Sequence, residues 1–459
     1  MTVSTEINAT PPAPHWTAAF PVVGYQHLVR LLQLYAALVL FEFAHRYMLE
    51  YWLSDVFGYF SFSYDHWRSG TYFWVCVLTP LSVLPAGVRL ESASHFMFLT
   101  FMTFVGLPTP IILVHFVTPD VFSYFYGCLF LSYTILAVCT RIYLRPIPSP
   151  LTERGYVRLL AITIGLFVAV LCYGITQQGF RLVDFSQLYQ IRYSNETANV
   201  FVQRIATLYV FSFGGLFVAQ CLMFRKMWLA AASLLAFIAC YGFLYEKTAA
   251  LAPIWFIYLY LVFKFFTRDS AVRFHIALAI PYYIGVVIFA LYPRTANGGN
   301  ILEFGYLALV VFRQYSATNL AVGLYYVFFQ DHPHTYWSHI TGIDYFIHYP
   351  YGNHSVAIEM ENAFGLGNFN ASFLATEGIE AYGYEALPFV SAAVGAVFIL
   401  LNTAARRFGP QVLALTMIMP SLMIDERPFG TSLLTGGIMF LIVYLAWMPR
   451  SWLNRSQNV

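Results

Sequence analysis

Apolar runs of membrane-spanning length follow one another along almost the whole chain and are separated by short polar connections. A helix needs ~20 mostly apolar residues to cross the hydrocarbon of a bilayer. By this measure we expect about twelve transmembrane helices, near residues 27–48, 71–88, 95–116, 120–140, 157–176, 200–223, 227–245, 248–266, 273–292, 386–404, 411–424 and 430–448. The pattern therefore predicts an all-α polytopic membrane protein.

The basic residues indicate which ends of these helices lie inside the cell. Cytoplasmic loops of membrane proteins carry an excess of Lys and Arg. If the twelve spans alternate in direction, one face collects Arg89, Arg141, Arg145, Arg154, Arg158, Arg225, Lys226, Lys264, Arg268, Arg273, Arg406, Arg407, Arg450 and Arg455. Both termini then lie on that face, so we expect both to be cytoplasmic.

One further apolar segment, 301–329, breaks this alternation if it crosses the membrane, because Arg406 and Arg407 would then lie outside. We therefore interpret it as an interfacial or re-entrant helix. The predicted organisation has three parts: an N-terminal transmembrane bundle of about nine spans (1–292), an outer loop with this helix (293–385) and C-terminal transmembrane hairpins of about three spans (386–459). We expect the outer loop to carry the function, because it is long and rich in polar residues.

Composition supports a membrane protein and excludes several functions. Hydrophobic residues make up 59% of the chain and charged residues only 10%, whereas a soluble domain carries about 25% charged residues. The sequence has no phosphate-binding glycine loop, no nucleotide-binding fingerprint and no basic stripe, so neither ATP-driven work nor nucleic-acid binding is expected. No cofactor is expected. His332 and His334 form an HxH pair, but no third ligand follows at a diagnostic spacing, so no metal is expected.

Isolated basic residues lie within or beside apolar sequence on the predicted outer side. They are Arg181, Arg192, Arg204, Lys247, Arg294, Arg313 and Arg427. A guanidinium offers a fixed fork of donors that matches phosphate oxygens, so several of them at the outer membrane face would bind a lipid pyrophosphate. The alternative is that each one snorkels to the interface or pairs with a nearby carboxylate.

The outer loop also collects histidines and carboxylates. They are His332, His334, His339, His348, His354, Asp331, Asp344, Glu359, Glu361, Glu377, Glu380 and Glu385. Transfer of a group to a hydroxyl needs a general base, and both His and Glu serve in that role. For any one of these histidines the alternative is a hydrogen-bonded structural role.

In these features the chain resembles the bacterial oligosaccharide repeat-unit polymerases of the O-antigen and enterobacterial-common-antigen type. The resemblance rests on FRLVDFSQLYQIR with Tyr189 and Arg192, on the apolar outer-loop helix with Arg313, on GNHSVAIEM and the following small-residue run with Asn353, His354 and Asn370, and on Arg427 in DERPFG. It covers the C-terminal 60% of the chain, roughly, and the transmembrane spans themselves carry no family information.

The resemblance implies a fold related to the C-type lipid-dependent glycosyltransferases. It also implies a polysaccharide polymerase of the bacterial inner (plasma) membrane. Such an enzyme transfers a glycan from undecaprenyl pyrophosphate to the sugar hydroxyl of an incoming lipid-linked repeat unit at the outer face. The implied partners are undecaprenyl-pyrophosphate-linked oligosaccharides, the bilayer and a polysaccharide chain-length regulator.

The implied site has three parts. Arg192, Arg313 and Arg427 would bind the pyrophosphate, with Arg204 and Lys247 in support. Tyr189, Asn353 and Asn370 would bind the glycan. The catalytic base would be Glu377 or His354.

Other functions remain open at this point. An O-antigen ligase or another C-type glycosyltransferase would share this architecture. A lipid-linked oligosaccharide transporter would need charges along a path through both leaflets, and only Glu42 lies well inside a span. A membrane acyltransferase would want a histidine buried in a span, and His45, His95, His115 and His275 all lie near span ends.

Overall fold

The computed structural model describes residues 24–145, 149–178, 180, 199–265, 270–292, 301–340, 343, 345–352, 354–366, 371–406, 408–449 and 452. These residues form helices and no β-strand, apart from one isolated antiparallel bridge between Arg89 and Ser270. The expected all-α fold is therefore confirmed for the part of the chain that the structure describes.

Ten helical segments in these described ranges are long and apolar enough to cross a membrane. They are Tyr25–Val56, His66–Ala86, Ala93–Phe116, Pro119–Cys139, Glu153–Gln177, Val200–Met223, Lys247–Lys264, Ala271–Leu291, Tyr384–Ala405 and Phe429–Trp447. Each overlaps one of the twelve predicted spans. The other two predicted spans are also helices, namely the shorter apolar helix α11 (Met227–Leu244) and the 17-residue helix α19 (Pro410–Glu426). The chain is thus a multi-pass, all-α membrane protein.

The first four spans and the connection between the first two consist of several helical pieces, of which the fourth span, α6, is a single continuous helix. These pieces are α1 (Tyr25–Met48), η1 (Leu49–Leu53), α2 (Ser54–Val56), η2 (Gly58–Phe60), η3 (His66–Arg68), α3 (Ser69–Leu78), η4 (Thr79–Ala86), α4 (Ala93–Phe101), η5 (Met102–Gly106), α5 (Pro108–Phe116) and α6 (Pro119–Cys139). Wide π-helical turns such as η1 and η5 change the direction of side chains within a helix without ending it.

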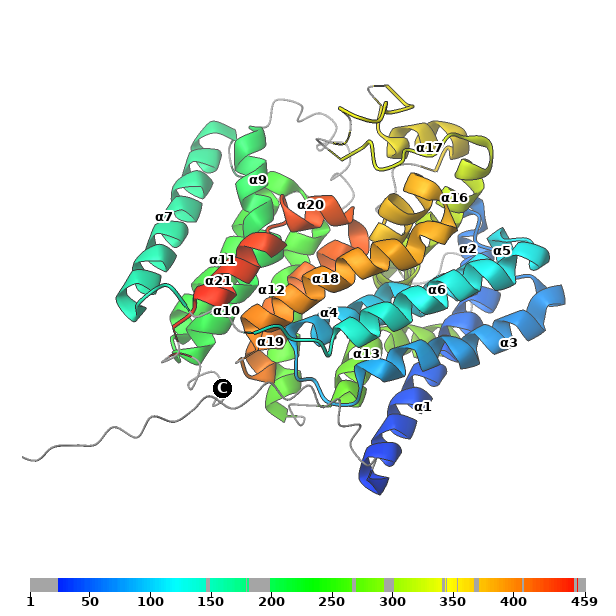
Figure 1. The fold of residues 1–459 in the computed structure, drawn as a ribbon, viewed down its shortest axis with the longest axis horizontal. Helices are drawn as coiled ribbons and strands as arrows, with labels where there is room; N and C mark the ends of the chain where they lie inside the picture. The colour runs from blue at the N-terminus through cyan, green and yellow to red at the C-terminus, as the bar shows by residue number, and fades with distance from the viewer. Residues whose placement is uncertain are drawn as a thin grey trace, which may run out of the picture.

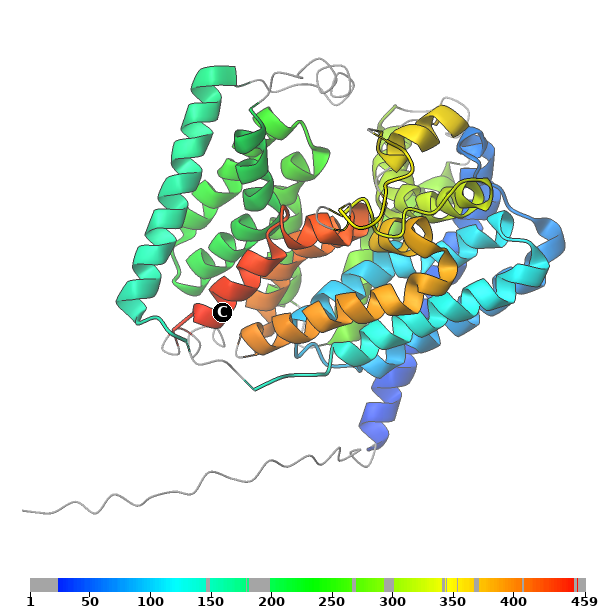
Figure 2. The same cartoon turned by 45° about the horizontal axis from the view of Figure 1, so that its top comes forward.

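The middle of the chain forms a second group of helices. These are α7 (Glu153–Gln178), α9 (Val200–Leu208), η6 (Tyr209–Phe213), α10 (Gly214–Met223), α11, α12 (Lys247–Phe265) and α13 (Ala271–Leu291). Figures 1 and 2 show α7, α9 and α11 on one side of the molecule, away from α6 and α3. Large apolar side chains of α7, such as Ile162 and Val168, are exposed, as expected for a helix that faces lipid.

Two helices form the centre of the protein. The span Ala93–Phe116, made of α4, η5 and α5, is buried along its whole apolar window. Helix α19 packs against α4, α10 and α12, and every residue from 411 to 425 is buried. Because these two helices contact protein on all sides, they can carry polar side chains that a lipid-facing helix could not.

The segment predicted to be the outer loop, for which this name is kept below, forms a set of short helices over one end of the bundle. They are α14 (Ile301–Tyr306), η8 (Leu307–Phe312), α15 (Arg313–Tyr315), α16 (Ala317–Asp331), α17 (Val356–Phe364), η9 (Leu374–Glu380) and η10 (Tyr384–Ala386). The predicted re-entrant helix is broken at Ser316, which lies between α15 and α16. Helix α16 packs against α5 and η9, so the loop is held against protein rather than projecting freely.

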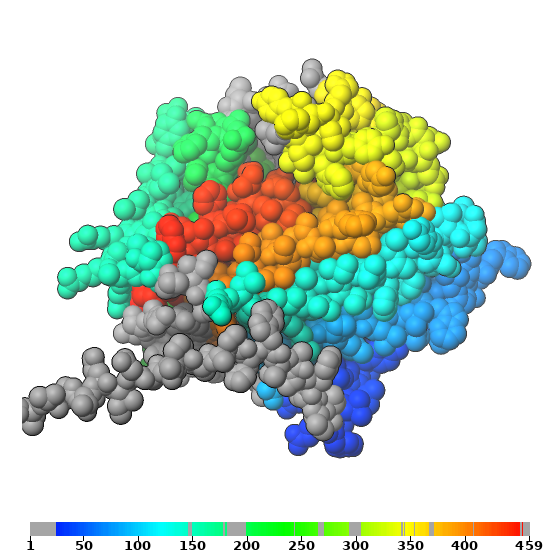
Figure 3. Space-filling model, in the orientation of Figure 1, coloured from blue at the N-terminus to red at the C-terminus, as the bar shows by residue number. Residues whose placement is uncertain are grey.

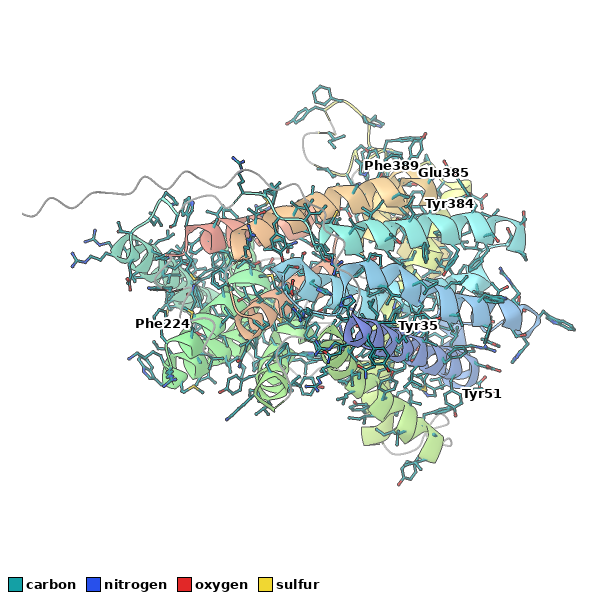
Figure 4. The ribbon with its side chains drawn as sticks, turned by 60° about the horizontal axis from the view of Figure 1, so that its bottom comes forward. Tyr35, Tyr51, Phe224, Tyr384, Glu385 and Phe389 are labelled. Carbon is teal, nitrogen blue, oxygen red and sulfur yellow. The ribbon has the colours of Figure 1, made fainter. Side chains whose placement is uncertain are left out.

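The C-terminal helices connect the outer loop back to the bundle. They are α18 (Leu387–Ala405), α19, α20 (Phe429–Leu433) and α21 (Ile438–Trp447). Helix α18 lies between α6 and α21, and Figure 3 shows these helices side by side beneath the yellow outer loop. At the loop end of α18, Tyr384 stacks on Phe125 of α6 with 4.8 Å between ring centroids, and Glu385 and Phe389 lie beside it (Figure 4). This packing fixes η9, which comes just before η10.

Candidate active site

Two buried carboxylates lie on the π-helical turn η9. Glu377 and Glu380 are three residues apart on this turn, and they are only 4% and 5% exposed. Gly378 lies between them, and a Cβ at this position would come within 2.5 Å of the Leu387 side chain. The glycine therefore allows η9 to pack closely on the start of α18, which holds both carboxylates inside the protein.

Glu377 connects η9 to the start of helix α20. Its Oε1 accepts a hydrogen bond of 3.0 Å from the backbone N–H of Gly430, and its Oε2 accepts one from the Thr376 hydroxyl. Burial raises the pKa of this carboxyl, and the hydrogen bonds from Thr376, Phe429 and Gly430 partly offset that rise. The backbone oxygen of Glu377 accepts a further hydrogen bond from the indole of Trp337, at 3.0 Å.

Glu380 forms a pair with His339. Its Oε1 lies 3.2 Å from Nδ1 of His339 and 3.5 Å from the Thr335 hydroxyl. Burial, together with the charge of Glu377, raises the pKa of Glu380 to about 8, and burial lowers the pKa of His339 to about 4. The distance would suit an ion pair, but with these pKa values both groups are mainly neutral at pH 7. The contact therefore joins a mainly protonated carboxyl and a mainly neutral imidazole rather than two opposite charges.

The chain that carries His339 is fastened to η9 through its backbone. The N–H groups of Thr335 and Tyr336 donate to the carbonyl oxygens of Glu380 and Ala381 at 3.0 and 2.9 Å. Tyr336 and Trp337 both have a positive φ, of 50° and 61°. Non-glycine residues rarely adopt this left-handed conformation, and the backbone strain that it represents often occurs at functional sites. Here it directs the indole of Trp337 at η9.

Three tyrosines surround the carboxylates. Tyr325 of α16 is almost fully buried, and its pKa is raised first by burial and then by the nearby charges of Glu380 and Glu377. Burial and Glu380 likewise raise the pKa of Tyr349 to about 12 and raise that of Tyr351. The site thus contains two buried acids with tyrosines nearby, and burial raises the pKa of both acids.

A cation lies on the same hairpin as Gly430. Arg427 follows α19, pairs with Glu246 through Nη2, and lies over the ring of Phe211 with 4.7 Å to the centroid. Lys247 is adjacent to Glu246 and begins α12. The backbone N–H of Gly430 donates to Glu377. Arg427 and Lys247 therefore belong to the same end of the molecule as the two carboxylates.

The structure brings together only some of the predicted site residues. Arg313 lies half-buried in α15, next to Phe312, which stacks on Phe57 at 3.9 Å. Arg204 is exposed on α9. His354 is exposed and bonds to Glu359 at 2.7 Å. Arg192, Tyr189, Asn353 and Asn370 lie outside the described residues.

Two residues of this site, Glu380 and His339, were among the outer-loop candidates but had no role assigned to them. The sequence places Glu380 one helical turn after Glu377, which was a usable signal. Nothing local connects either one to His339. The partner of Arg427, Glu246, is 181 residues away in the chain and had no sequence signal.

Among the described residues, no group of three or more His, Cys, Asp or Glu side chains is arranged to hold a metal ion. The chain was also compared with known proteins. No protein-family model, curated protein or solved structure matches it. The site geometry and the sequence are therefore the basis for a functional assignment.

Proposed function

We propose that the chain is a polysaccharide polymerase that transfers a glycan from undecaprenyl pyrophosphate to the sugar hydroxyl of a lipid-linked repeat unit. The observation that carries the proposal is the arrangement at the outer-loop end of the membrane bundle. There Glu380 lies beside His339, and Glu377 on the same turn bonds to the hairpin that carries Arg427. Such a reaction needs a proton acceptor for the hydroxyl and cations for the leaving pyrophosphate, both close to the membrane surface.

In this reaction the acceptor oxygen attacks the anomeric carbon of the donor glycan. The bond from that carbon to the pyrophosphate oxygen breaks, and its electron pair leaves with the lipid pyrophosphate. The proton of the acceptor hydroxyl passes to the carboxylate form of Glu380, which shares it with His339. Glu380 suits this role better than Glu377 or His354, because its pKa of about 8 lies near physiological pH.

The other residues have supporting roles in the proposal. Glu377 positions η9 against α20 through Gly430. Arg427 and Lys247 contact the pyrophosphate, and Arg313, Arg204 and Arg192 are further candidates for it. Tyr189, Asn353 and Asn370 remain the candidates for glycan binding. The same proposal includes a fold related to the C-type lipid-dependent glycosyltransferases, about twelve membrane spans and a location in the bacterial inner membrane.

The glycan profile of a deletion strain tests this function against the alternatives. We expect loss of long chains while single repeat units remain attached to the final carrier. Loss of all attached glycan would contradict a polymerase and would instead favour an O-antigen ligase or a transporter.

The proposed topology is tested with reporter fusions. Fusions after Arg268 and after Arg407 should report the cytoplasm, and a fusion at Gly352 should report the outer side, because the basic loops then all lie inside. The break at Ser316 fits a segment that enters the protein without crossing the membrane. A cytoplasmic signal at Gly352 would mean that 301–329 crosses the membrane, and the candidate site would then lie on the wrong side for a lipid-linked donor.

A further inference from the structure

A hollow lies at the opposite end of the bundle from η9. Helix α4 begins at this hollow, and helix α6 ends there. At the other end of the bundle, the span that starts with α4 contacts α16, and α6 contacts η10. The hollow has a volume of about 500 Å³, which is in the range of sites for small organic ligands. It is lined by Gly24, His27, Ala86, Val88, Arg89, Glu91, Ser92, His95, Thr140, Arg141 and Tyr143.

The walls of this hollow are held by a polar network. Asn402 of α18 accepts a hydrogen bond from the N–H of Ser94 and donates to the carbonyl oxygen of Thr140, both at 3.0 Å. The Ser92 hydroxyl also donates to the Thr140 oxygen, at 2.8 Å. These bonds tie the start of α4, the end of α6 and α18 together. The hollow is thus part of the folded structure rather than a gap between loose loops.

Two arginines give the hollow a positive charge. Arg89 lies 4.0 Å from Glu91, and both side chains are exposed, so water screens this pair. Arg141 has no carboxylate within ion-pair distance among the described residues. Its guanidinium lies over the backbone of Gly87, where a Cβ would come within 2.4 Å of Nη2, and the φ of +85° at Gly87 also favours glycine. The glycine therefore makes room for the guanidinium at the edge of the hollow.

His95 contributes a buried polar atom. The residue is 2% exposed, and its Nε2 has no hydrogen-bond partner in the described part of the chain. A buried polar atom without a partner is costly in a folded protein. Its place in the wall of the hollow would be explained by a ligand that supplies the missing partner.

We propose that this hollow binds the phosphate group of an anionic, hydroxyl-bearing ligand. The guanidiniums of Arg89 and Arg141 bind the phosphate oxygens, which match their donor geometry. A hydroxyl of the same ligand donates to Nε2 of His95. The exposed apolar side chains of Tyr25 and Leu28 at the adjoining end of α1 would suit the acyl chains of a lipid. A soluble phosphate compound would use the same polar contacts, so the experiment separates these two sources.

The test uses the full-length protein in nanodiscs of phosphatidylcholine with phosphatidylglycerol, followed by native mass spectrometry of the lipid retained in detergent. Arg141→Ala is compared with Arg158→Ala, a matched exposed arginine on α7. We expect Arg141→Ala to reduce the retention of phosphatidylglycerol about tenfold or more, and Arg158→Ala to retain it like the wild type. A second arm measures the melting temperature of lipid-free protein with inorganic phosphate.

Retention of phosphatidylglycerol without a response to inorganic phosphate would identify a membrane lipid as the ligand. A rise in melting temperature with inorganic phosphate in the wild type, absent in Arg141→Ala, would identify a soluble anion. Equal behaviour of the wild type, Arg141→Ala and Arg158→Ala in both arms would overturn the site. Since neither arm measures glycan transfer, this result is independent of the proposed polymerase function.

Discussion

Glycan polymerisation by the wild-type protein should become faster as the pH rises towards about 8, and Glu380→Gln should remain slow at every pH. Only the ionised carboxyl can accept the proton of the acceptor hydroxyl, and this form becomes dominant above the pKa of Glu380. Loss of a general base typically lowers a rate by ~10²–10⁴-fold. The measurement is the rate of polymer formation from purified lipid-linked repeats by purified protein across this pH range.

The stability of the wild type should change in the opposite direction over the same range. The pKa of Glu380 is raised in the folded protein above its ordinary value of 4.5, so stability falls as the pH rises from about 4.5 and levels off above about 8. His339 has a lowered pKa, so it reduces stability only as the pH falls below about 6.5. Between pH 6.5 and 8, the change of stability with pH that this pair causes therefore comes mainly from Glu380. As the pH rises over this range, the melting temperature should fall more in the wild type than in Glu380→Gln.

Two further variants separate the possible bases. Glu361→Gln changes a half-buried carboxyl of α17 and should leave the pH profile as in the wild type. His354→Ala should retain most of the activity, because His354 is exposed and bonds to Glu359. If Glu380→Gln made normal polymer and His354→Ala did not, His354 would be the base and our assignment of Glu380 would be wrong.

The helical spans could be predicted from the sequence because their signal is local. A run of ~20 apolar residues has few alternatives to a membrane helix, and ten such runs in the described chain are helices of this length. The sequence did not distinguish the central helix α19 from a lipid-facing one. Gln411, Thr416 and Asp425 were a usable signal, since polar side chains within a span normally face protein, and all three are buried.

The site was harder to predict, because its contacts connect distant parts of the chain. The carboxylates of η9 were recognisable as a cluster, but their environment was not. The burial that raises the pKa of Glu380 comes from the packing of η9 on α16 and α18. His339 is brought to it because the backbone of Thr335 and Tyr336 bonds to Glu380 and Ala381. Periodicity reports which face of a helix is apolar, and it carries no information about which loop covers that face.

Arg427→Ala should lower polymer formation by ~10²–10³-fold, the usual loss for one electrostatic contact in an active site. Arg427→Lys should retain partial activity, because lysine keeps the charge but loses the fork of donors. Arg204→Ala serves as a comparison, since Arg204 is exposed on α9 and has a weaker claim to the site. The measurement is the rate of transfer with purified lipid-linked repeats at equal amounts of folded protein.

The ion pair with Glu246 provides the control that separates binding from structure. If Arg427 only holds α19 to α12, then Glu246→Gln removes the same ion pair and should lower activity and melting temperature as much as Arg427→Ala does. If Arg427 also binds the pyrophosphate, Glu246→Gln should leave a guanidinium that is still seated on Phe211 and free to bind the anion. Activity would then fall much less in Glu246→Gln than in Arg427→Ala. Equal activity losses in the two variants would show that Arg427 is structural, and the cation for the leaving group would have to be sought among Lys247, Arg313 and Arg192.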